Sequence, residues 1–592
     1  MKRLLPLLLA LLLCVCILTP ATVHGLPETD FPVPFFQEAL LSALYEADIT
    51  ALRRAIDTGL VTCEELTSYY LDRIEAYDDP YNCFITICDG ALEVARQRDA
   101  QLARGEATGV LFGIPLVIKD NMDLEGYLTT NGHKKSESPM AEDNAYVVSR
   151  LLEEGAVIIA KANMSTDAQD ARISYSQAVG QTKNAYNTLL ASGGSSGGSA
   201  VATSLNFTAA SLGTDTNSSL RIPAVLNGCV SLRPTFDLIS RDGIALLNRT
   251  RDVPGAITRS VRDLAIMMDV LTDHQYQYTE KLNPNALEGL RIGILKQLVR
   301  SKNDDADPEV LAAFNSAVEE LRQLGAEVVE VSMSKLFTLS DPTFNSNKQS
   351  LKDALYEEFL DFLEKNDLDA VVYPTYSSTP LRSGTDKNGT YWNAWEQPFL
   401  NNCRTLAPSA GIPEVSVVIG YHSLGAGIGM EITAPKHQEQ LLLDIAYAYT
   451  QRFDHRVPPT GAPDAYAGAN AGSLEFLIQS YRAAAEAATA PTTEPTTEPT
   501  APPTEPATLP PATEPAPVPT SPEATTPAET QPMAPGNAEP PSLLWLWLIP
   551  VVCAVMAIAV LLILRIRNIL RHRSRRRRKR KQQQSERDSD YV

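Results

Sequence analysis

Between residues 36 and 486 the apolar positions follow two periods, one typical of helices and one typical of strands. Thr62 and Glu65 have the spacing of a capping box, which predicts a helix that continues to Ala76. Apolar residues recur along it at the spacing that lines one helix face. A short helix is expected at 50–58, because Gly59 follows it as a stop signal.

Further along, strands and helices alternate. An apolar strand is expected at 116–118, directly before Lys119, and another at 209–212. Asp307 has the features of an N-cap, because Pro308 occupies the first helical position after it. Helix–strand pairs are expected at 145–154 and 157–160, at 308–324 and 328–331, and at 351–365 and 370–373.

This alternation predicts an α/β fold with a large central mixed β-sheet that helices cover on both faces. Segment 36–486 is long enough for about three domains, but no linker-like stretch interrupts it. We therefore expect a single domain.

The N-terminus has the pattern of a secretory signal peptide. Lys2 and Arg3 precede an apolar run from Leu4 to Leu18, and small residues follow up to Gly25. Residues 1–25 are therefore predicted to be a signal peptide, with an uncleaved signal anchor as the alternative. Both interpretations predict that the chain beyond this segment is exported.

The C-terminal hundred residues predict a membrane anchor on a stalk. Segment 487–541 is rich in Pro, Thr, Glu and Ala and poor in large apolar residues, which is typical of a disordered linker. Segment 543–564 is uncharged and long enough to cross a bilayer, with Trp545 and Trp547 at its outer edge. The basic tail 565–592 is expected to stay in the cytoplasm, which makes this a single-pass cell-membrane protein with an extracellular domain.

Charge and cysteine content exclude several classes of function. The chain carries a net charge of −20 although its tail is basic, so the exported part is strongly acidic and no nucleic-acid partner is expected. Five cysteines lie outside the predicted signal and membrane segments and are expected to be buried thiols with at most one bridge: Cys63, Cys83, Cys88, Cys229 and Cys403. No cluster has zinc-ligand spacing, so neither a metal nor a cofactor is expected.

Three polar features are candidates for amide chemistry, which needs a nucleophile, a proton carrier and donors for an oxyanion. Ser219 lies where a helix opens after the strand at 209–212, and its alternative role is an N-cap. The Gly/Ser run 192–200 contains Ser195 and is otherwise a flexible loop. Lys119 ends an apolar strand, where burial would lower its pKa, although a lysine before Asp120 is more often a solvated ion pair.

The run 192–200 also allows other interpretations. It lacks the Gly-Lys-Ser/Thr ending of a phosphate-binding loop. Residues 194–198 match the Gly-x-Ser-x-Gly elbow of α/β-hydrolases, which would make Ser196 the nucleophile and need a histidine such as His437. That elbow normally follows an apolar strand, and residues 186–192 do not have such a pattern.

Taken together, these segments resemble the amidase signature family. The resemblance rests on the glycine–serine run, Gly213-Thr214-Asp215-Thr216, Arg221-Ile222-Pro223 and Ser231-Leu232-Arg233-Pro234-Thr235, and it extends over about residues 39–453. It implies the amidase signature fold and hydrolysis by a Ser-Ser-Lys triad.

By this resemblance Ser219 is the nucleophile, Ser195 is the bridging serine with a cis peptide bond, and Lys119 is the base. The main-chain N–H groups of Thr216, Asn217, Ser218 and Ser219 form the oxyanion hole. Asp215 and Arg221 hold that loop, and Ser196 supports the triad.

The chain departs from the family just before the nucleophile, where the family usually has Gly-Gly and this chain has Asn217-Ser218. If the loop required positive φ, Asn would tolerate it better than Ser. Residues 217–219 also form a glycosylation sequon, and modification there would block catalysis, so a bacterial surface protein is favoured. We expect a variant active site, because all three triad side chains are present.

The predicted function is an extracellular, membrane-tethered amidase for a small amide or a C-terminal peptide amide. Esterase or aryl-acylamidase activity is a variant of the same chemistry. The family's tRNA-dependent amidotransferases are disfavoured because their substrates are cytoplasmic, and a fatty-acid amide hydrolase role would need a membrane-embedding helix within the domain. The alternative from another class is a catalytically silent binding or adhesion protein on the same fold.

Overall fold

The computed structural model describes residues 33–299, 306–340, 348–385, 390–467 and 473–489. All of them belong to the first of two compact units, residues 1–494. The predicted signal peptide, the membrane segment 543–564, the tail 565–592 and all but the first residues of the predicted stalk lie outside the described residues. Among the residues described, no helix is both long and apolar enough to cross a membrane.

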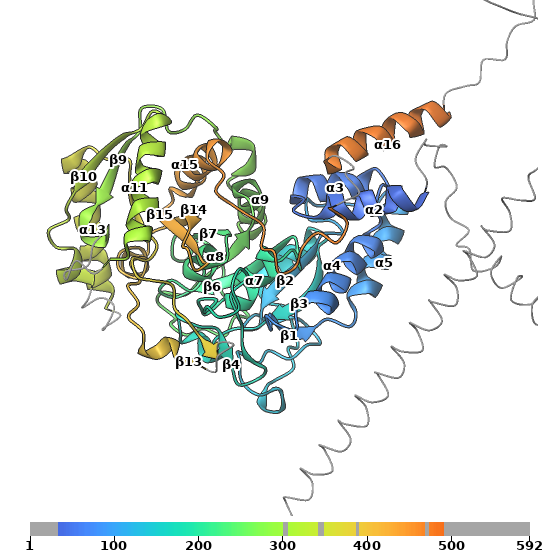
Figure 1. Cartoon of the computed structure of the whole chain (residues 1–592), viewed down its shortest axis with the longest axis horizontal. Coiled ribbons are helices and arrows are strands. Elements are labelled where there is room, and N and C mark those ends of the chain that lie inside the picture. The colour runs from blue at the N-terminus through green and yellow to red at the C-terminus, as the bar shows by residue number, and fades with distance from the viewer. Residues whose placement is uncertain (1–32, 300–305, 341–347, 386–389, 468–472, 490–592) are drawn as a thin grey trace, which may run out of the picture. The chain divides into compact units, whose positions relative to one another are not determined.

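A mixed sheet forms the centre of the fold (Figure 1). Its eleven strands follow the order β1-β3-β2-β6-β8-β7-β14-β15-β11-β9-β10. In chain order they are β1 (Phe84–Ile87), β2 (Pro115–Lys119), β3 (Val157–Ala162), β6 (Ala210–Asp215), β7 (Val230–Arg233), β8 (Val253–Thr258), β9 (Arg291–Leu295), β10 (Glu327–Val331), β11 (Ala370–Pro374), β14 (Glu414–Tyr421) and β15 (Gly427–Thr433). Two small sheets pair β4 (Tyr175–Ser176) with β5 (Gly180–Gln181) and β12 (Gly384–Thr385) with β13 (Tyr391–Trp392).

The predicted helices at 50–58, 62–76, 145–154, 308–324 and 351–365 are present, with further helices beside them. The α-helices are α2 (Val33–Leu44), α3 (Ile49–Asp57), α4 (Cys63–Tyr77), α5 (Ala91–Ala103), α6 (Tyr146–Glu153), α7 (Gly197–Ser204), α8 (Arg221–Leu226), α9 (Val261–Leu271), α10 (Lys296–Val299), α11 (Pro308–Gln323), α13 (Gln349–Asn366), α14 (Ala407–Ala410), α15 (Glu439–Arg452) and α16 (Leu474–Thr489). Among the residues described, the 3₁₀ turns are η1 (Lys135–Glu137), η2 (Thr166–Ala168), η3 (Thr279–Lys281) and η4 (Ala394–Glu396).

Local sequence signals set several of these boundaries. Thr62 Oγ1 accepts from the Glu65 N–H at 3.0 Å while the Glu65 carboxylate accepts from the Thr62 N–H at 2.9 Å, which is the predicted capping box of α4. Asp307 caps α11 as expected, by accepting from the Glu309 N–H at 2.9 Å. Both helices therefore begin where the sequence predicts.

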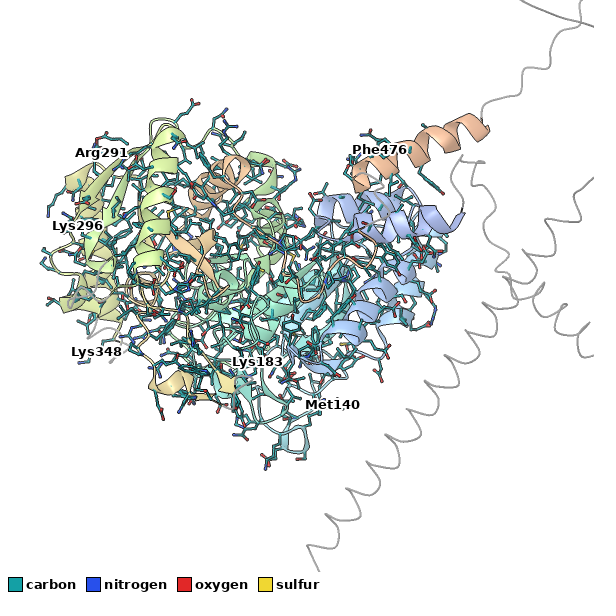
Figure 2. All side chains as sticks on the ribbon, viewed as in Figure 1. Met140, Lys183, Arg291, Lys296, Lys348 and Phe476 are labelled. Carbon is teal, nitrogen blue, oxygen red and sulfur yellow. The ribbon has the colours of Figure 1, made fainter. Side chains whose placement is uncertain are left out.

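Helices cover both faces of the sheet, as β8 illustrates. Adjacent strand residues point to opposite faces. Ala256 lies in the largest apolar cluster, together with residues of α9, whereas Ile257 lies in a separate cluster with Ala200 of α7 and Ala224 of α8. At the periphery, Lys296 of α10 and Phe476 of α16 are exposed, the latter by 59% (Figure 2).

The register of the sheet brings the candidate residues to one edge. β2 pairs with β6 in parallel, with Leu116 opposite Ala210 and Val117 opposite Ser211. The carboxyl ends of parallel strands meet at the same edge of a sheet. Lys119 at the end of β2 and Asp215 at the end of β6 are therefore neighbours, although 96 positions separate them along the chain.

Candidate active site

The glycine–serine run is a buried, close-packed segment and not a flexible loop. All residues from Ser192 to Ala200 are buried, and helix α7 begins within the run at Gly197. A Cβ at Gly194 would lie 2.4 Å from the carbonyl oxygens of Asp170 and Ile173, and one at Gly198 would lie 2.4 Å from that of Asn163. The glycines are therefore required for close approach of neighbouring backbone.

Lys119 is the centre of the site. Its side chain is completely buried, and Nζ lies 2.7 Å from Ser195 Oγ, 2.9 Å from Ser196 Oγ and 2.8 Å from Thr214 Oγ1. Because Ser196 Oγ donates to the Thr214 carbonyl at 3.2 Å, it accepts from Lys119. A neutral amine has two N–H donors and one lone pair, so donation to Ser196 and Thr214 leaves the lone pair for the Ser195 hydroxyl.

Burial lowers the pKa of Lys119 from 10.5 to about 7, while the charges of Asp252 and Asp215 oppose this change. The interior disfavours the ammonium because it cannot replace the hydration that the cation has in water. A substantial fraction of Lys119 is therefore a neutral amine at neutral pH. This is the state that can accept a proton. The alternative of a solvated ion pair with Asp120 is wrong, because both side chains are completely buried and Asp120 lies beside Lys161 instead.

A main-chain hydrogen bond joins the segments that carry Ser195 and Ser219. The peptide bond between Gly194 and Ser195 is cis. The N–H of Ser196 donates to the carbonyl of Ser219 at 3.2 Å, which joins the glycine–serine run to the turn before α8. Ser219 is 5% exposed. The contacts thus connect Lys119 to Ser195 directly, and the step from Ser195 to Ser219 stays a prediction.

The turn from Thr216 to Ser219 has main-chain N–H groups that can bind an anion. Within the described part of the chain, its four main-chain N–H groups donate to no protein acceptor. Unpaired N–H groups that precede a helix can bind an anion. Among the residues described, neither Asn217 nor Ser218 has positive φ, so the departure from Gly-Gly causes no left-handed strain here.

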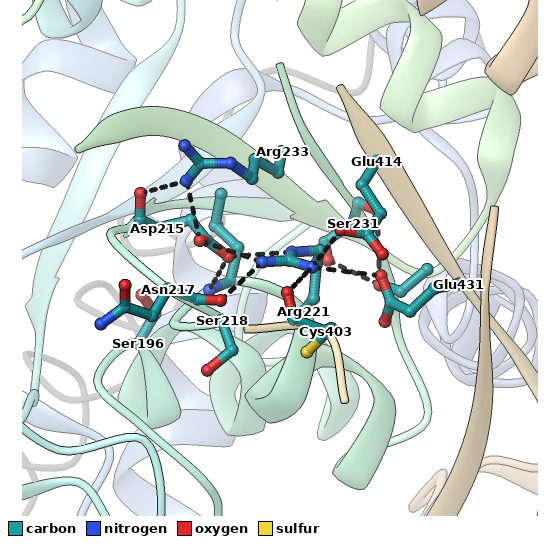
Figure 3. A network of polar contacts seen from close by, with 12 residues as sticks. Ser196, Asp215, Asn217, Ser218, Arg221, Ser231, Arg233, Cys403, Glu414 and Glu431 are labelled. Atoms are coloured by element: carbon teal, nitrogen blue, oxygen red, sulfur yellow. Dashed lines mark hydrogen bonds and ion pairs between the residues drawn. The ribbon is translucent and has the colours of Figure 1, made fainter. Parts of the chain in front are cut away.

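Two arginines and a carboxylate fix this turn (Figure 3). Asp215 accepts from Arg221 Nε at 3.1 Å, from Arg233 Nη1 at 2.9 Å and from the Leu220 N–H at 3.2 Å. Arg221 Nη2 in turn donates to the Asn217 carbonyl at 2.9 Å. These cations, Arg221 first, hold the pKa of Asp215 below its usual range despite its burial.

The same arginine continues the network into the sheet. Arg221 Nη1 lies 2.6 Å from Glu414 and 3.5 Å from Glu431, and all three side chains are buried (Figure 3). Burial raises the pKa of Glu431 well above its usual range, and the neighbouring Glu414 raises it further. Burial and the neighbouring Glu414 carboxyl thus favour the protonated form of Glu431.

Sequence reasoning did not assign five residues of this network to the site: Thr214, Arg233, Asn401, Glu414 and Glu431. Thr214 and Arg233 lie inside motifs that the resemblance already used, so their positions were available signals, whereas Glu414 and Glu431 lie outside those motifs. Asn401, which donates to Ser218 Oγ at 2.7 Å, has no such signal.

The structure does not bring together the residues that the α/β-hydrolase interpretation needs. His437 is exposed, and its backbone N–H donates to Thr235 Oγ1, while Ser196 contacts Lys119 instead of a histidine. The elbow interpretation with His437 is therefore not supported.

The five described cysteines are buried and unbridged, and no group of three or more possible metal ligands occurs among the residues described.

Comparison with known proteins identifies the family. A profile described as Amidase matches residues 65–345. A glutamyl-tRNA(Gln) amidotransferase chain from Thermosynechococcus vestitus is 30% identical over 481 residues, which cover 68% of this chain and 97% of that protein.

Two solved structures have the same fold. Native peptide amidase from Stenotrophomonas maltophilia is 28% identical, with a TM-score of 0.59, over 70% of this chain and 98% of that one. Peptide amidase in complex with the competitive inhibitor chymostatin is also 28% identical, with a TM-score of 0.60, over 70% of this chain and 99% of that one. The chain therefore belongs to the amidase signature family.

Proposed function

We propose that the domain hydrolyses a carboxylic amide, either a small amide or a C-terminal peptide amide, through an acyl-enzyme on Ser219. The observation that carries this proposal is a completely buried lysine with a pKa of about 7 at 2.7 Å from Ser195 Oγ. A neutral amine in this position is a general base that operates at physiological pH. The likeness to two peptide amidase structures supports an amide substrate.

In the proposed reaction Ser219 Oγ attacks the amide carbonyl carbon. Its proton passes to Ser195 Oγ while Ser195 passes its own proton to Lys119 Nζ. The carbonyl oxygen becomes an oxyanion, which the main-chain N–H groups of Thr216 to Ser219 stabilise. The relay then reverses, so that the nitrogen leaves as a free amine or ammonia and Ser219 remains acylated.

Water completes the cycle over the same relay. It loses a proton to the Ser195–Lys119 pair as it attacks the Ser219 ester, and the return of that proton releases Ser219 and the carboxylic acid. Ser196 and Thr214 keep Nζ in position by accepting its two N–H bonds. Asp215 and Arg221 hold the oxyanion turn.

A fluorophosphonate probe tests this proposal on the purified protein. The wild type should be labelled and should hydrolyse amides in a panel of primary amides, peptide amides and anilides, whereas Ser219→Ala should lose both properties and keep its fold. Absence of labelling in a folded wild-type protein would favour the silent binding protein. Loss of activity in His437→Ala would favour the α/β-hydrolase interpretation.

We also propose that the enzyme acts outside the cell. This rests on the sequence of residues 1–25, 543–564 and 565–592, which predicts export, a single membrane span and a cytoplasmic basic tail. Protease treatment of intact cells should remove the amidase domain and leave a membrane-bound fragment that carries the tail. Protection of the domain under these conditions would contradict this topology.

A further inference from the structure

The oxyanion turn, residues 216–219, contains Ser218 where the family usually has glycine. The Ser218 side chain makes a contact that a glycine could not make. Ser218, in the position before the nucleophile, is completely buried, and its Oγ accepts a hydrogen bond from Asn401 Nδ2 at 2.7 Å. We propose that Asn401 is a positioning residue for amide hydrolysis, which holds the oxyanion hole through the Ser218 hydroxyl. This inference rests on the proposed function of Ser219 and its turn.

Asn401 is itself fixed, so it can serve as an anchor. It forms a β-bridge with Tyr376, just beyond the end of β11, and the Ser377 N–H donates to the Leu400 carbonyl at 3.0 Å. Cys403 Sγ lies 3.2 Å from Asn401 Oδ1 and donates to it. Because this contact uses the amide oxygen, the amide N–H group is left to donate to Ser218.

The turn is held from two sides by different groups. On one side, Arg221 Nη2 donates to the Asn217 carbonyl at 2.9 Å, and Arg251 Nη1 lies 3.3 Å from Asn217 Oδ1. On the other side, Asn401 binds Ser218. Glycine at position 218 would have no side chain to bind, so the serine creates both an anchor point and a buried hydroxyl that needs a partner.

We expect the Asn401 contact to stabilise the transition state more than the bound substrate. Main-chain N–H groups stabilise an oxyanion only if they already point to where its charge develops. Loss of the Asn401 contact should leave Ser218 unpaired and allow the turn to move. We therefore expect kcat to fall while KM changes little.

The test is a double-mutant cycle on the purified full-length protein, with the best substrate from the amide panel. Asn401→Ala should lower kcat by about tenfold to a hundredfold, less than the removal of an oxyanion donor itself, and change KM by less than about threefold. In a Ser218→Gly background the same substitution should lower kcat by less than about threefold, because the hydroxyl that needs Asn401 is gone. Asn401→Asp, which keeps the side-chain shape, should also lower kcat because it places a carboxylate beside the turn.

Asn402→Ala is the matched control. Asn402 Nδ2 donates to the Pro374 carbonyl at 2.9 Å and to Ser377 Oγ at 2.6 Å, so it fixes the same segment without contacting the turn. It should lower the melting temperature and leave kcat within about threefold of the wild type.

Among the Asn401 variants, either of two results would overturn the inference: wild-type kcat in both Asn401→Ala and Asn401→Asp, or an undiminished Asn401→Ala effect in the Ser218→Gly background. An equal loss of kcat in Asn402→Ala would show a general structural role and would also overturn it. Full activity in Ser219→Ala would instead refute the proposed function itself, so the two failures are distinguishable.

Discussion

Lys119→Met tests the physical basis of the proposed relay, because it keeps the length of a buried side chain and removes the amine. In the native protein Nζ is completely buried and has a pKa of about 7, against 10.5 for an exposed lysine. One pKa unit corresponds to about 1.4 kcal/mol, so keeping this amine buried costs about 4 kcal/mol of folding stability at neutral pH. The hydroxyls of Ser195, Ser196 and Thr214 lose a partner in the variant, at about 1 kcal/mol each.

At neutral pH the variant should therefore be about as stable as the wild type or slightly more stable, while its amidase activity is lost. The sign of the pH dependence follows from proton binding. Between the native pKa of about 7 and the unfolded value of 10.5, the unfolded chain binds more protons at Lys119 than the folded chain does. The wild type should therefore gain stability relative to the variant as pH rises, by about 2 kcal/mol from about pH 7 to about pH 9.

Urea unfolding of both proteins over this pH range measures that difference, and kcat/KM against pH provides the second readout. Because the neutral amine is the active form, kcat/KM of the wild type should rise with an apparent pKa of about 7. A stability difference that does not change with pH, or activity in Lys119→Met, would refute the reasoning.

Lys161→Met is a control for the loss of any buried lysine. Lys161 is also completely buried, but its Nζ donates to the Leu128 carbonyl and to Thr129 Oγ1 and lies 3.6 Å from Asp120. Its removal should destabilise the protein by about 3 kcal/mol, because Asp120 loses its cation. It should leave the pH profile of kcat/KM unchanged.

Further substitutions test the other parts of the site. Ser219→Ala and Ser195→Ala should each lower kcat by at least about a thousandfold, measured by release of ammonia, whereas retention of wild-type kcat by either would remove that serine from the relay. Asp215→Asn should destabilise the protein by about 3–5 kcal/mol in urea, because Arg221 and Arg233 both lose a buried partner, and an unchanged unfolding midpoint would contradict this role. His437→Ala should have wild-type kcat/KM, since the side chain is exposed.

Elements with strong local signals were predictable from the sequence. The capping box at Thr62 and the Asp307-Pro308 pair place the starts of α4 and α11, because a cap is satisfied within a few residues of the chain. Apolar runs that end at a polar residue identify β2 and β6, because this pattern too is contained in a few consecutive residues. The fold class follows from the alternation of such elements.

The glycine–serine run shows the limit of local reasoning. As a string it is typical of a flexible loop, yet a Cβ at Gly198 would clash with the backbone of both Cys83 and Asn163. Those contacts are set by strands and turns that are distant in the sequence. The loop that a local pattern predicts is therefore a rigid, buried start of α7.

The sequence by itself determined several of the helices and strands and, through the family motifs, the identity of Lys119, Ser195 and Ser219 as candidates. Only the tertiary structure decided what these groups can do. The pKa of Lys119 depends on complete burial, and the anchoring of Ser218 depends on Asn401, which lies 183 positions further along the chain. Electrostatic environment and hydrogen-bond partners arise from contacts across the fold, and a one-dimensional pattern does not contain them.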